Sequence, residues 1–496
     1  MKIFCLLLAL SFPLLTFSQS YSNIDFAAQI SKESIKEKVE VLCSDKMRGR
    51  EAGTHGQKLA ANYIYNQFKN NGLKSLDRTS DSLSFFQSFN LSKLRLPSGK
   101  IQIDGNSFYN YKDFIADPVK DSISIDLELI FIGNSPIENY SEIDFTNKAV
   151  LFLTPNFYKA FFKAHNIWKH SKPKLILFAD PINHHLFNRY LNIKKRIRNK
   201  QFRLNITPTD SIEQSEQSDF LKYVNGKQII PISTRLTKAI TGLSSKKLRR
   251  LALNKNKTVT SKANLNYKLI RGDDIIKTEN ILALIEGAEK PDEYIVISAH
   301  YDHLGAYKNH IYHGANDNAS GTAALIEVAK AFKYAELKGQ RPKRSVIFVA
   351  FTAEEKGLLG SKYFVRNSPV PLKSITANLN MDMLGRMDDH HTSANYIYLL
   401  GASHLNPQLK QISDSLNKLQ SHLILDYEYD HVDNLLYQAS DQASFVKNKI
   451  PSIMYFNGLH QDYHTVEDTA DKLNYENIKR VAQLVFLTAW EIANQL

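Results

Sequence analysis

From about residue 265 to the last residue, buried strands alternate with helices, and this alternation constrains the fold most strongly. The segments 293–300 (EYIVISAH) and 344–351 (RSVIFVAF) are near-continuous apolar runs, and the helical pattern of 320–338 lies between them. A strand has such a run when both of its faces are covered, which is typical of parallel sheets. We therefore expect an α/β fold with a mixed, mostly parallel β-sheet and helices on both faces.

The middle of the chain differs in charge and in pattern. Residues 100–262 contain 27 Lys and Arg against 14 Asp and Glu, which accounts for the whole net charge of +13. Short β-type runs separated by turn residues follow one another here, with one helical pattern around residues 157–170. We predict a smaller, β-rich domain over 100–262, inserted into a larger domain formed by 19–99 and 263–496.

The most basic runs of this middle part are 192–203 and 246–257. Such runs are usually solvated faces; the alternative is a docking surface for an anionic polymer or for membrane headgroups. Neither run carries an aromatic stacking pattern or a known nucleic-acid motif, so we expect no nucleic-acid partner.

Residues 1–18 have the pattern of a secretory signal peptide. Lys2 precedes an apolar stretch from Ile3 to Phe17, and small residues stand before a cut ahead of Gln19. The alternative is a membrane anchor, but the stretch is shorter than the ~20 residues that a span needs and it contains Pro13. We predict an exported protein, periplasmic or extracellular, with no transmembrane segment after cleavage.

The number of cysteines indicates that the fold is stabilised by its hydrophobic core and not by disulfide bonds. Cys5 lies in the predicted signal peptide, so that Cys43 is the one cysteine of the mature chain. No intramolecular disulfide is therefore expected.

Metal-binding side chains stand at successive strand ends of the C-terminal part. Each could be a cap, a loop residue or a solvated charge if it stood alone. In an open α/β sheet, however, ligands gather beyond the carboxyl ends of the strands. The residues at these ends are His300, Asp302, Asp317, Glu354, Glu355, Asp382 and His464.

These residue types suit zinc, which binds imidazole nitrogen and carboxylate oxygen and leaves room for water in catalytic sites. Two histidines and three carboxylates are enough for two open zinc sites about 4 Å apart if one carboxylate bridges them. Of the adjacent Glu354 and Glu355, one would then bind zinc while the other handles a proton. The repulsion between them would be offset by the cations.

Five motifs, in the order SAHYDHLG, GANDNASG, FTAEEKGLLGS, NMDMLG and YHTVEDT, resemble the co-catalytic di-zinc exopeptidases. This family contains secreted aminopeptidases and glutamate carboxypeptidases, and the resemblance covers about 19–95 and 265–496. It implies the zinc exopeptidase fold and two Zn²⁺ per chain. The implied metal ligands are His300 and Asp382 for one zinc, Glu355 and His464 for the other, and Asp317 as the bridge.

The same resemblance implies three further roles. Glu354 falls on the general base, Asp302 on the acid that orients His300, and Tyr463 on a phenol that stabilises the oxyanion in some members. The middle segment resembles, more weakly, the protease-associated domain that many members carry. It departs from that pattern in being basic and in having SKPKLILFA where a Gly/Ala-rich passage is usual. Gln442 stands where many relatives have His, at a position that is not a ligand.

The function predicted from these features is a secreted zinc-dependent exopeptidase, an aminopeptidase that hydrolyses N-terminal residues from peptides. The two zincs would polarise the scissile carbonyl and activate a water whose proton Glu354 takes. A glutamate carboxypeptidase, for which Arg386 is a candidate carboxylate-binding residue, is one alternative. A one-zinc glutaminyl cyclase and a non-catalytic receptor on the same fold are others, and the complete ligand set argues against both. The sequence does not predict the oligomeric state.

Overall fold

The computed structural model divides the chain into two compact units. Unit 1 is Met1–Ser88 with Thr278–Leu496, and unit 2 is Phe89–Lys277. The structure describes residues 22–76, 85–94, 97–116, 122–156, 160–183, 187–188, 191, 202–204, 228–255, 257, 259–270, 273–431 and 434–495. The predicted signal peptide and most of the basic run 192–203 lie outside the described residues.

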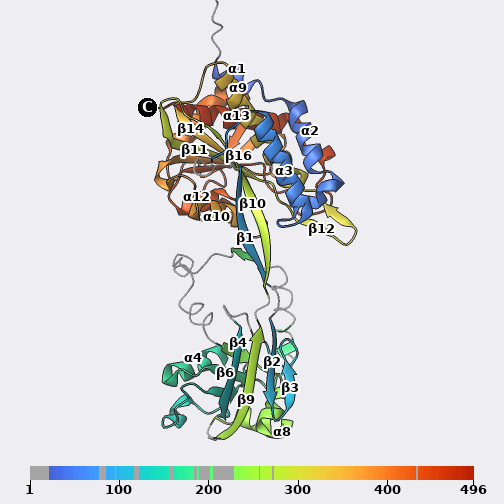
Figure 1. Cartoon of the computed structure of the whole chain (residues 1–496), viewed down its shortest axis with the longest axis vertical. Helices are drawn as coiled ribbons and strands as arrows, with labels where there is room; N and C mark the ends of the chain where they lie inside the picture. The colour runs from blue at the N-terminus through green and yellow to red at the C-terminus, as the bar shows by residue number, and fades with distance from the viewer. Residues whose placement is uncertain are drawn as a thin grey trace, which may run out of the picture. The chain divides into compact units, whose positions relative to one another are not determined.

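Unit 1 is built on a mixed sheet (Figure 1) with the strand order β17-β16-β18-β15-β11-β14-β10-β1. Its centre is parallel, because β11 pairs in parallel with both β14 and β15, and β15 with β18; β10 and β16 run antiparallel to their central neighbours. The strands are β1 (Phe86–Leu94), β10 (Asp273–Ile285), β11 (Lys290–His300), β14 (Arg344–Phe351), β15 (Ile375–Met381), β16 (Tyr396–Leu400), β17 (Ile424–Asp426) and β18 (Ser452–Phe456).

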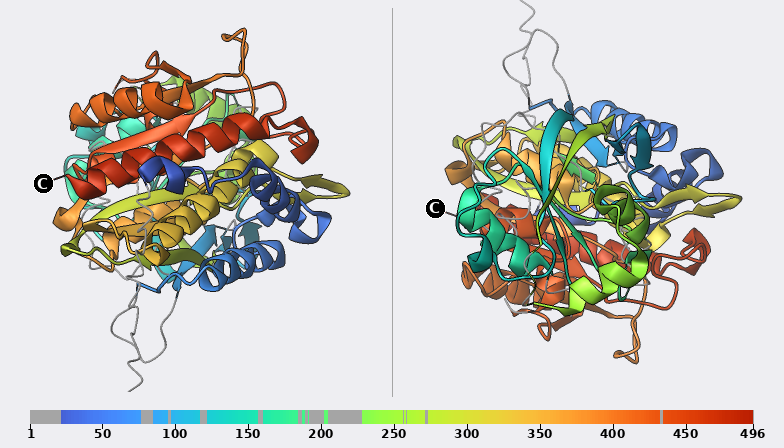
Figure 2. Two further views of the ribbon diagram at one scale, coloured as in Figure 1. Left: turned by 90° about the horizontal axis from the view of Figure 1, so that it is seen from above. Right: turned by 90° about the horizontal axis from the view of Figure 1, so that it is seen from below.

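Helices cover both faces of this sheet, as alternate side chains of the strands require. Ile295 and Ile297 of β11 join one core with α9 (Gly321–Leu337) and α13 (Tyr475–Asn494). Val296 joins another core with α10 (Leu359–Arg366) and α12 (Gln442–Lys447). Figure 2 shows α9 and α13 running side by side over the sheet. The predicted α/β fold with a mixed sheet and helices on both faces is confirmed.

The remaining elements of unit 1 lie before β1, in the connections between strands or after β18. The helices are α1 (Asn23–Ala27), α2 (Lys32–Leu42), α3 (His55–Asn70) and α11 (Gln408–Leu416). Two short strands, β12 (Gly305–Tyr307) and β13 (His310–Tyr312), form a hairpin. Short helical turns are η1 (Asp45–Arg50), η3 (Ala315–Ser320), η4 (Leu372–Ser374), η5 (Asn417–Ser421), η6 (Leu435–Gln438) and η7 (Ala470–Lys472).

Unit 2 is β-rich and has a seven-stranded sheet with the order β3-β2-β9-β4-β5-β6-β8. Its strands are β2 (Ser98–Ile103), β3 (Asn106–Tyr109), β4 (Ile123–Phe131), β5 (Ala149–Leu153), β6 (Leu175–Ala179), β8 (Gln228–Pro231) and β9 (Ser261–Ile270), and β7 (Phe202–Leu204) pairs with the Leu91–Lys93 end of β1. Its helices are α4 (Ala160–Ser171), α7 (Thr234–Thr241), α8 (Ser245–Leu253) and the turn η2 (Ile137–Tyr140). The predicted segment 100–262 lies inside this unit, and its likeness to a protease-associated domain stays a prediction.

Unit 2 encloses its own apolar cores on the two faces of its sheet. Leu151 of β5 belongs to one core together with Leu248 of α8, and Val150 belongs to another together with Ala164 of α4. Across the part of the chain that the structure describes, no helix has the length and apolar character needed to span a bilayer.

Candidate metal centre

The carboxyl ends of three parallel strands bring the predicted site residues to one edge of the sheet. β11 ends at His300, β14 is followed by Glu354 and Glu355, and β15 is followed by Asp382. Parallel neighbours end at the same edge, so these side chains meet although they are far apart in sequence. Asp317 comes from η3 at the start of α9, and His464 from the loop after β18.

The first group of donors surrounds His300. Its Nε2 lies 3.2 Å from Asp382 Oδ1 and 3.3 Å from Asp317 Oδ1. Glu354 Oε2 is farther away, 4.0 Å from the same nitrogen. His300 and Asp382 therefore face the same point as one oxygen of Asp317, while Glu354 stands beside them.

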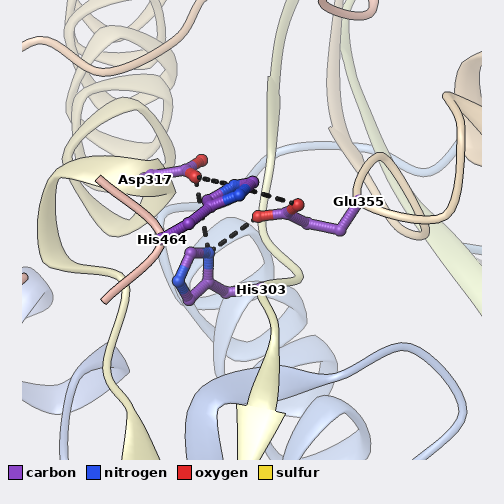
Figure 3. A group of neighbouring side chains, drawn as sticks. All are labelled: His303, Asp317, Glu355 and His464. Atoms are coloured by element: carbon purple, nitrogen blue, oxygen red, sulfur yellow. Dashed lines mark ion pairs between the residues drawn. The ribbon is translucent and has the colours of Figure 1, made fainter. Parts of the chain in front are cut away.

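The second group uses the other oxygen of Asp317. His464 Nε2 lies 3.0 Å from Asp317 Oδ2 and 3.2 Å from Glu355 Oε2 (Figure 3). The two oxygens of one carboxylate thus point to different histidines, which is the arrangement that a bridging ligand needs. The five predicted ligands are brought together by the structure, and their roles as ligands stay a prediction.

His303 is a further member of the second group that the sequence prediction did not include. Its Nδ1 lies 2.8 Å from Glu355 Oε1 and 3.5 Å from Asp317 Oδ2 (Figure 3). The signal that could have found it is its place in the motif HYDH, where a second imidazole follows His300 in the same loop.

The donor atoms of the second group are arranged for binding a shared cation and not for hydrogen bonding to one another. His303 Nδ1 and Nε2, Glu355 Oε1 and His464 Nε2 are buried atoms without a hydrogen-bond partner among the described residues, although their neighbours are close. Buried polar atoms are normally hydrogen-bonded. Close nitrogen–oxygen approaches without hydrogen-bond geometry are expected where a cation satisfies both atoms, and imidazole with carboxylate suits zinc.

Asp302 is fully buried behind His300. His300 Nδ1 lies 3.2 Å from the Asp302 carbonyl oxygen and 3.9 Å from the carboxylate oxygen Oδ1. That same Oδ1 accepts a hydrogen bond of 3.0 Å from the backbone N–H of Glu354. Burial raises the pKa of Asp302 to about 7. Asp302 therefore links the loop that carries His300 to the loop that carries Glu354, and its main-chain oxygen is the atom closer to His300.

Arg50 supports the same loop from inside the core, which gives the motif RGREAGTHG a place next to the site. Its side chain is fully buried and donates hydrogen bonds to four backbone carbonyls. The acceptors are Leu42 at 2.6 Å, His313 at 2.7 Å, and Tyr301 and Gly314 at 2.8 Å. Tyr301 lies between His300 and Asp302, so Arg50 fixes the backbone from which these side chains project.

Two other predicted residues lie close by. Tyr463 stacks on the ring of His464 with centroids 3.8 Å apart, and burial raises the pKa of its phenol well above the usual range. Arg386, the candidate for binding a substrate carboxylate, donates from Nη2 to Asp462 Oδ2 at 2.8 Å. That guanidinium is therefore engaged with a carboxylate of this chain through Nη2, while its Nη1 is buried without a hydrogen-bond partner among the described residues.

Titration of the metal-free site is dominated by burial and by close opposite charges. Burial raises the pKa of Glu354 well above its usual value. Burial alone would also raise the pKa of Asp317, but the histidines around it lower that pKa well below its usual value. Asp441, another fully buried acid that the sequence prediction missed, has its pKa raised to about 6 by burial.

Zinc affinity is expected to increase with pH, because the metal must displace protons from the histidines. Burial lowers the pKa of His464, but Asp317 and Glu355 outweigh it and raise that pKa to about 10. The pKa of His300 is likewise raised well above its usual value, by Asp382 and Glu354 against burial. The acids around both rings therefore favour their protonated forms in the metal-free chain, and zinc binds only the neutral form.

The expected gain is about tenfold in affinity per pH unit for each proton displaced. Zinc titration calorimetry between about pH 6 and pH 8, in two buffers of different ionisation enthalpy, measures both the affinity and the protons released. Affinity that does not change with pH, without proton release, would contradict protonated histidines in the metal-free site.

Comparison with known proteins shows what this chain resembles. Residues 280–489 match the model of peptidase family M28. Over 224 residues the chain is 31% identical to a probable glutamate carboxypeptidase of Arabidopsis thaliana, covering 41% of this chain and 29% of the relative. It is 26% identical over 281 residues to the aminopeptidase YwaD of Bacillus subtilis, covering 54% of this chain and 56% of that protein.

A solved structure of a zinc aminopeptidase from Bacillus subtilis aligns with 94% of this chain and 96% of its own, at 18% identity and a TM-score of 0.48. The chain spans little more than half, or less, of the length of the two curated relatives. The family match and the names of these relatives confirm the resemblance to the zinc exopeptidases that the order of the motifs predicted.

Proposed function

We propose that this chain is an exported, zinc-dependent aminopeptidase that removes N-terminal residues from peptides with two zinc ions per chain. The observation that carries the proposal is the sharing of Asp317 between two donor groups. Its Oδ1 faces His300 and its Oδ2 faces His464, at 3.3 Å and 3.0 Å. The carboxylate of Glu354 lies beside these groups, 4.0 Å from His300 Nε2, and is therefore not in close contact with that histidine.

When bound, zinc supplies Lewis-acid polarisation of the scissile carbonyl and makes water acidic enough to attack at neutral pH. His300, Asp382 and Asp317 would hold one ion, and Glu355, His464 and Asp317 the other. Asp302, through its carbonyl oxygen, keeps the Nε2 of His300 directed at the site. Tyr463, next to His464, is placed to donate its phenol proton to the developing oxyanion.

Glu354 is the proposed general base. Its carboxylate accepts the proton of the attacking water and passes it to the leaving amine. Burial holds the pKa of this acid high in the metal-free chain, and a high pKa is what a proton acceptor working near neutral pH needs. Bound cations would lower that pKa again, so that the carboxylate is ionised in the working enzyme.

The free amino end of the substrate is favoured over its carboxyl end by the state of Arg386. Its guanidinium is paired with Asp462, and both side chains are nearly buried, with exposed fractions of 13% and 12%. A glutamate carboxypeptidase, which is what one relative is named, would need an arginine free to bind the substrate carboxylate. The proposed localisation, periplasmic or extracellular, rests on the signal-like residues 1–18.

A purified chain beginning at Gln19 is expected to contain about two zinc ions and to hydrolyse aminoacyl-nitroanilides until a chelator is added. The measurement combines metal analysis with parallel assays on a free-amine substrate, its N-acetylated form and a peptide ending in glutamate. Cleavage of the acetylated peptide at its C-terminal glutamate would move the protein to the carboxypeptidases. Two zinc ions with no hydrolysis of any substrate would contradict an exopeptidase.

A further inference from the structure

We propose that His303 is a third imidazole ligand of this centre, so that the second group is closed around its cation by four side chains. The proposal rests on the metal centre of the proposed function and goes beyond it. It makes the two sites unequal: one is a closed site with His303, and the other, with His300, has fewer side-chain donors.

The spacing of the four donor atoms fits a single tetrahedral zinc. With zinc–ligand distances of ~2.0–2.1 Å, the edges of a tetrahedron of donors are about 3.3 Å long. In the second group, His303 Nδ1 lies 2.8 Å from Glu355 Oε1 and 3.5 Å from Asp317 Oδ2, and His464 Nε2 lies 3.0 Å from Asp317 Oδ2 and 3.2 Å from the other Glu355 oxygen, Oε2. One ligand atom from each of the four residues lies within 4.8 Å of those of the other three, which is close enough for a single ion to gather them.

His303 has no other evident role among the described residues. The side chain is fully buried, and neither ring nitrogen has a hydrogen-bond partner there. A buried imidazole without partners is costly, since desolvation of a polar group is not repaid. Its Nδ1 is directed at the oxygens of Glu355 and Asp317, where a cation would satisfy all three atoms at once (Figure 3).

The chain also makes room for this ring. Gly314 has a φ of +58°, and a Cβ added there would collide with the His303 ring and with the backbone oxygen of Asp317. A glycine is therefore needed where the backbone before η3 passes close to His303. The Gly314 carbonyl is held in turn by Arg50 Nη2 at 2.8 Å. Space for the imidazole is thus built into the turn that also presents Asp317.

The two sites are expected to differ in affinity and in accessibility. Structural zinc sites are closed by four protein ligands, whereas catalytic sites have three and leave one position open. His303, Asp317, Glu355 and His464 form the first kind of set. His300, Asp382 and the second oxygen of Asp317 form the other kind, with Glu354 beside it. The closed site should therefore fill first and release its ion last.

X-ray absorption spectroscopy at the zinc edge tests the proposal on the unaltered chain. With both sites filled, His300, His303 and His464 would give about 1.5 imidazoles per zinc; without His303 the value would be about 1.0. With one zinc per chain, about two imidazoles are expected if the closed site fills first. A value of about 1.0 in both samples would overturn the proposal.

Two variants separate a ligand from a hydrogen-bonding neighbour of Glu355. His303→Ala is expected to weaken the tighter zinc site more than 100-fold, beyond the ~10–100-fold that the loss of a supporting hydrogen bond costs. His303→Gln can still donate a hydrogen bond to Glu355 but is a poor zinc ligand, so it should weaken the site equally. Full rescue by His303→Gln would overturn the proposal, and thermal unfolding of the metal-free variants checks that both are folded.

His313→Gln is the matched control, because His313 follows the β12–β13 hairpin that His303 precedes, but its ring pairs with the exposed Asp45 at 3.0 Å. It should leave both zinc affinities and the imidazole count unchanged. The inference and the proposed function fail differently. Two bound zinc ions with hydrolysis but only about 1.0 imidazole per zinc would remove His303 alone from the centre. A chain that binds no zinc would overturn both.

Discussion

Replacing Glu354 by Gln is expected to leave the zinc content unchanged and to reduce kcat by about 10²–10⁴-fold or more. The substitution keeps the shape of the side chain and removes only its ability to accept a proton. Glu354 Oε2 is 4.0 Å from His300 Nε2, so it contributes less to the donor groups than Asp382 or Asp317 does. Steady-state kinetics with an aminoacyl-nitroanilide and metal analysis of the same sample measure both effects.

Glu355→Gln is the matched control for Glu354→Gln. Glu355 is the adjacent residue and has a nearly buried side chain as well, 5% exposed against 12% for Glu354, but its oxygens lie 2.8 Å from His303 and 3.2 Å from His464. Its neutralisation should therefore reduce zinc content as well as activity. If Glu354→Gln turned over at a near-normal rate, Glu354 would not be the base. If Glu354→Gln lost zinc as Glu355→Gln does, Glu354 would be a ligand instead.

The sequence could predict the core of unit 1 and the gathering of site side chains at the carboxyl ends of its strands, because both follow from short hydrophobic patterns in the sequence. An apolar run such as 344–351 has few alternatives to a buried strand, and parallel strands end at one edge. His300, Glu355 and Asp382 each stand within a few residues of such an end. Their approach therefore needed no knowledge of loop conformation.

His303 and Asp441 could not be predicted in the same way. His303 lies in a loop after β11, where no period of two or 3.6 residues tells which side chains point to the site. Asp441 precedes α12, a position at which an acid is ordinarily a helix cap. The path of the backbone decides where these two side chains lie, and the loop sequences do not specify that path by a pattern.

Replacing Arg50 by Met is expected to lower the free energy of unfolding by about 3–5 kcal/mol and to weaken zinc binding. Arg50 satisfies four carbonyls, those of Leu42, Tyr301, His313 and Gly314, which lie up to 264 residues away in sequence. Methionine fills much of the volume but donates no hydrogen bond. Each carbonyl that is left buried without a partner costs about 1–3 kcal/mol, reduced where water can enter.

The effect on zinc follows from where two of these carbonyls lie. Tyr301 follows the proposed ligand His300, and Gly314 comes three residues before Asp317, so the loss of Arg50 frees both loops to move. Chemical denaturation of the metal-free chain and zinc titration measure the two effects separately. Arg48→Met, in the same turn but exposed, should change neither quantity by more than about 0.5 kcal/mol. Equal stability of the two variants would show that Arg50 does not support these loops. If Arg50→Met lowered the stability but left the zinc affinity unchanged, Arg50 would stabilise the fold without positioning the proposed zinc ligands.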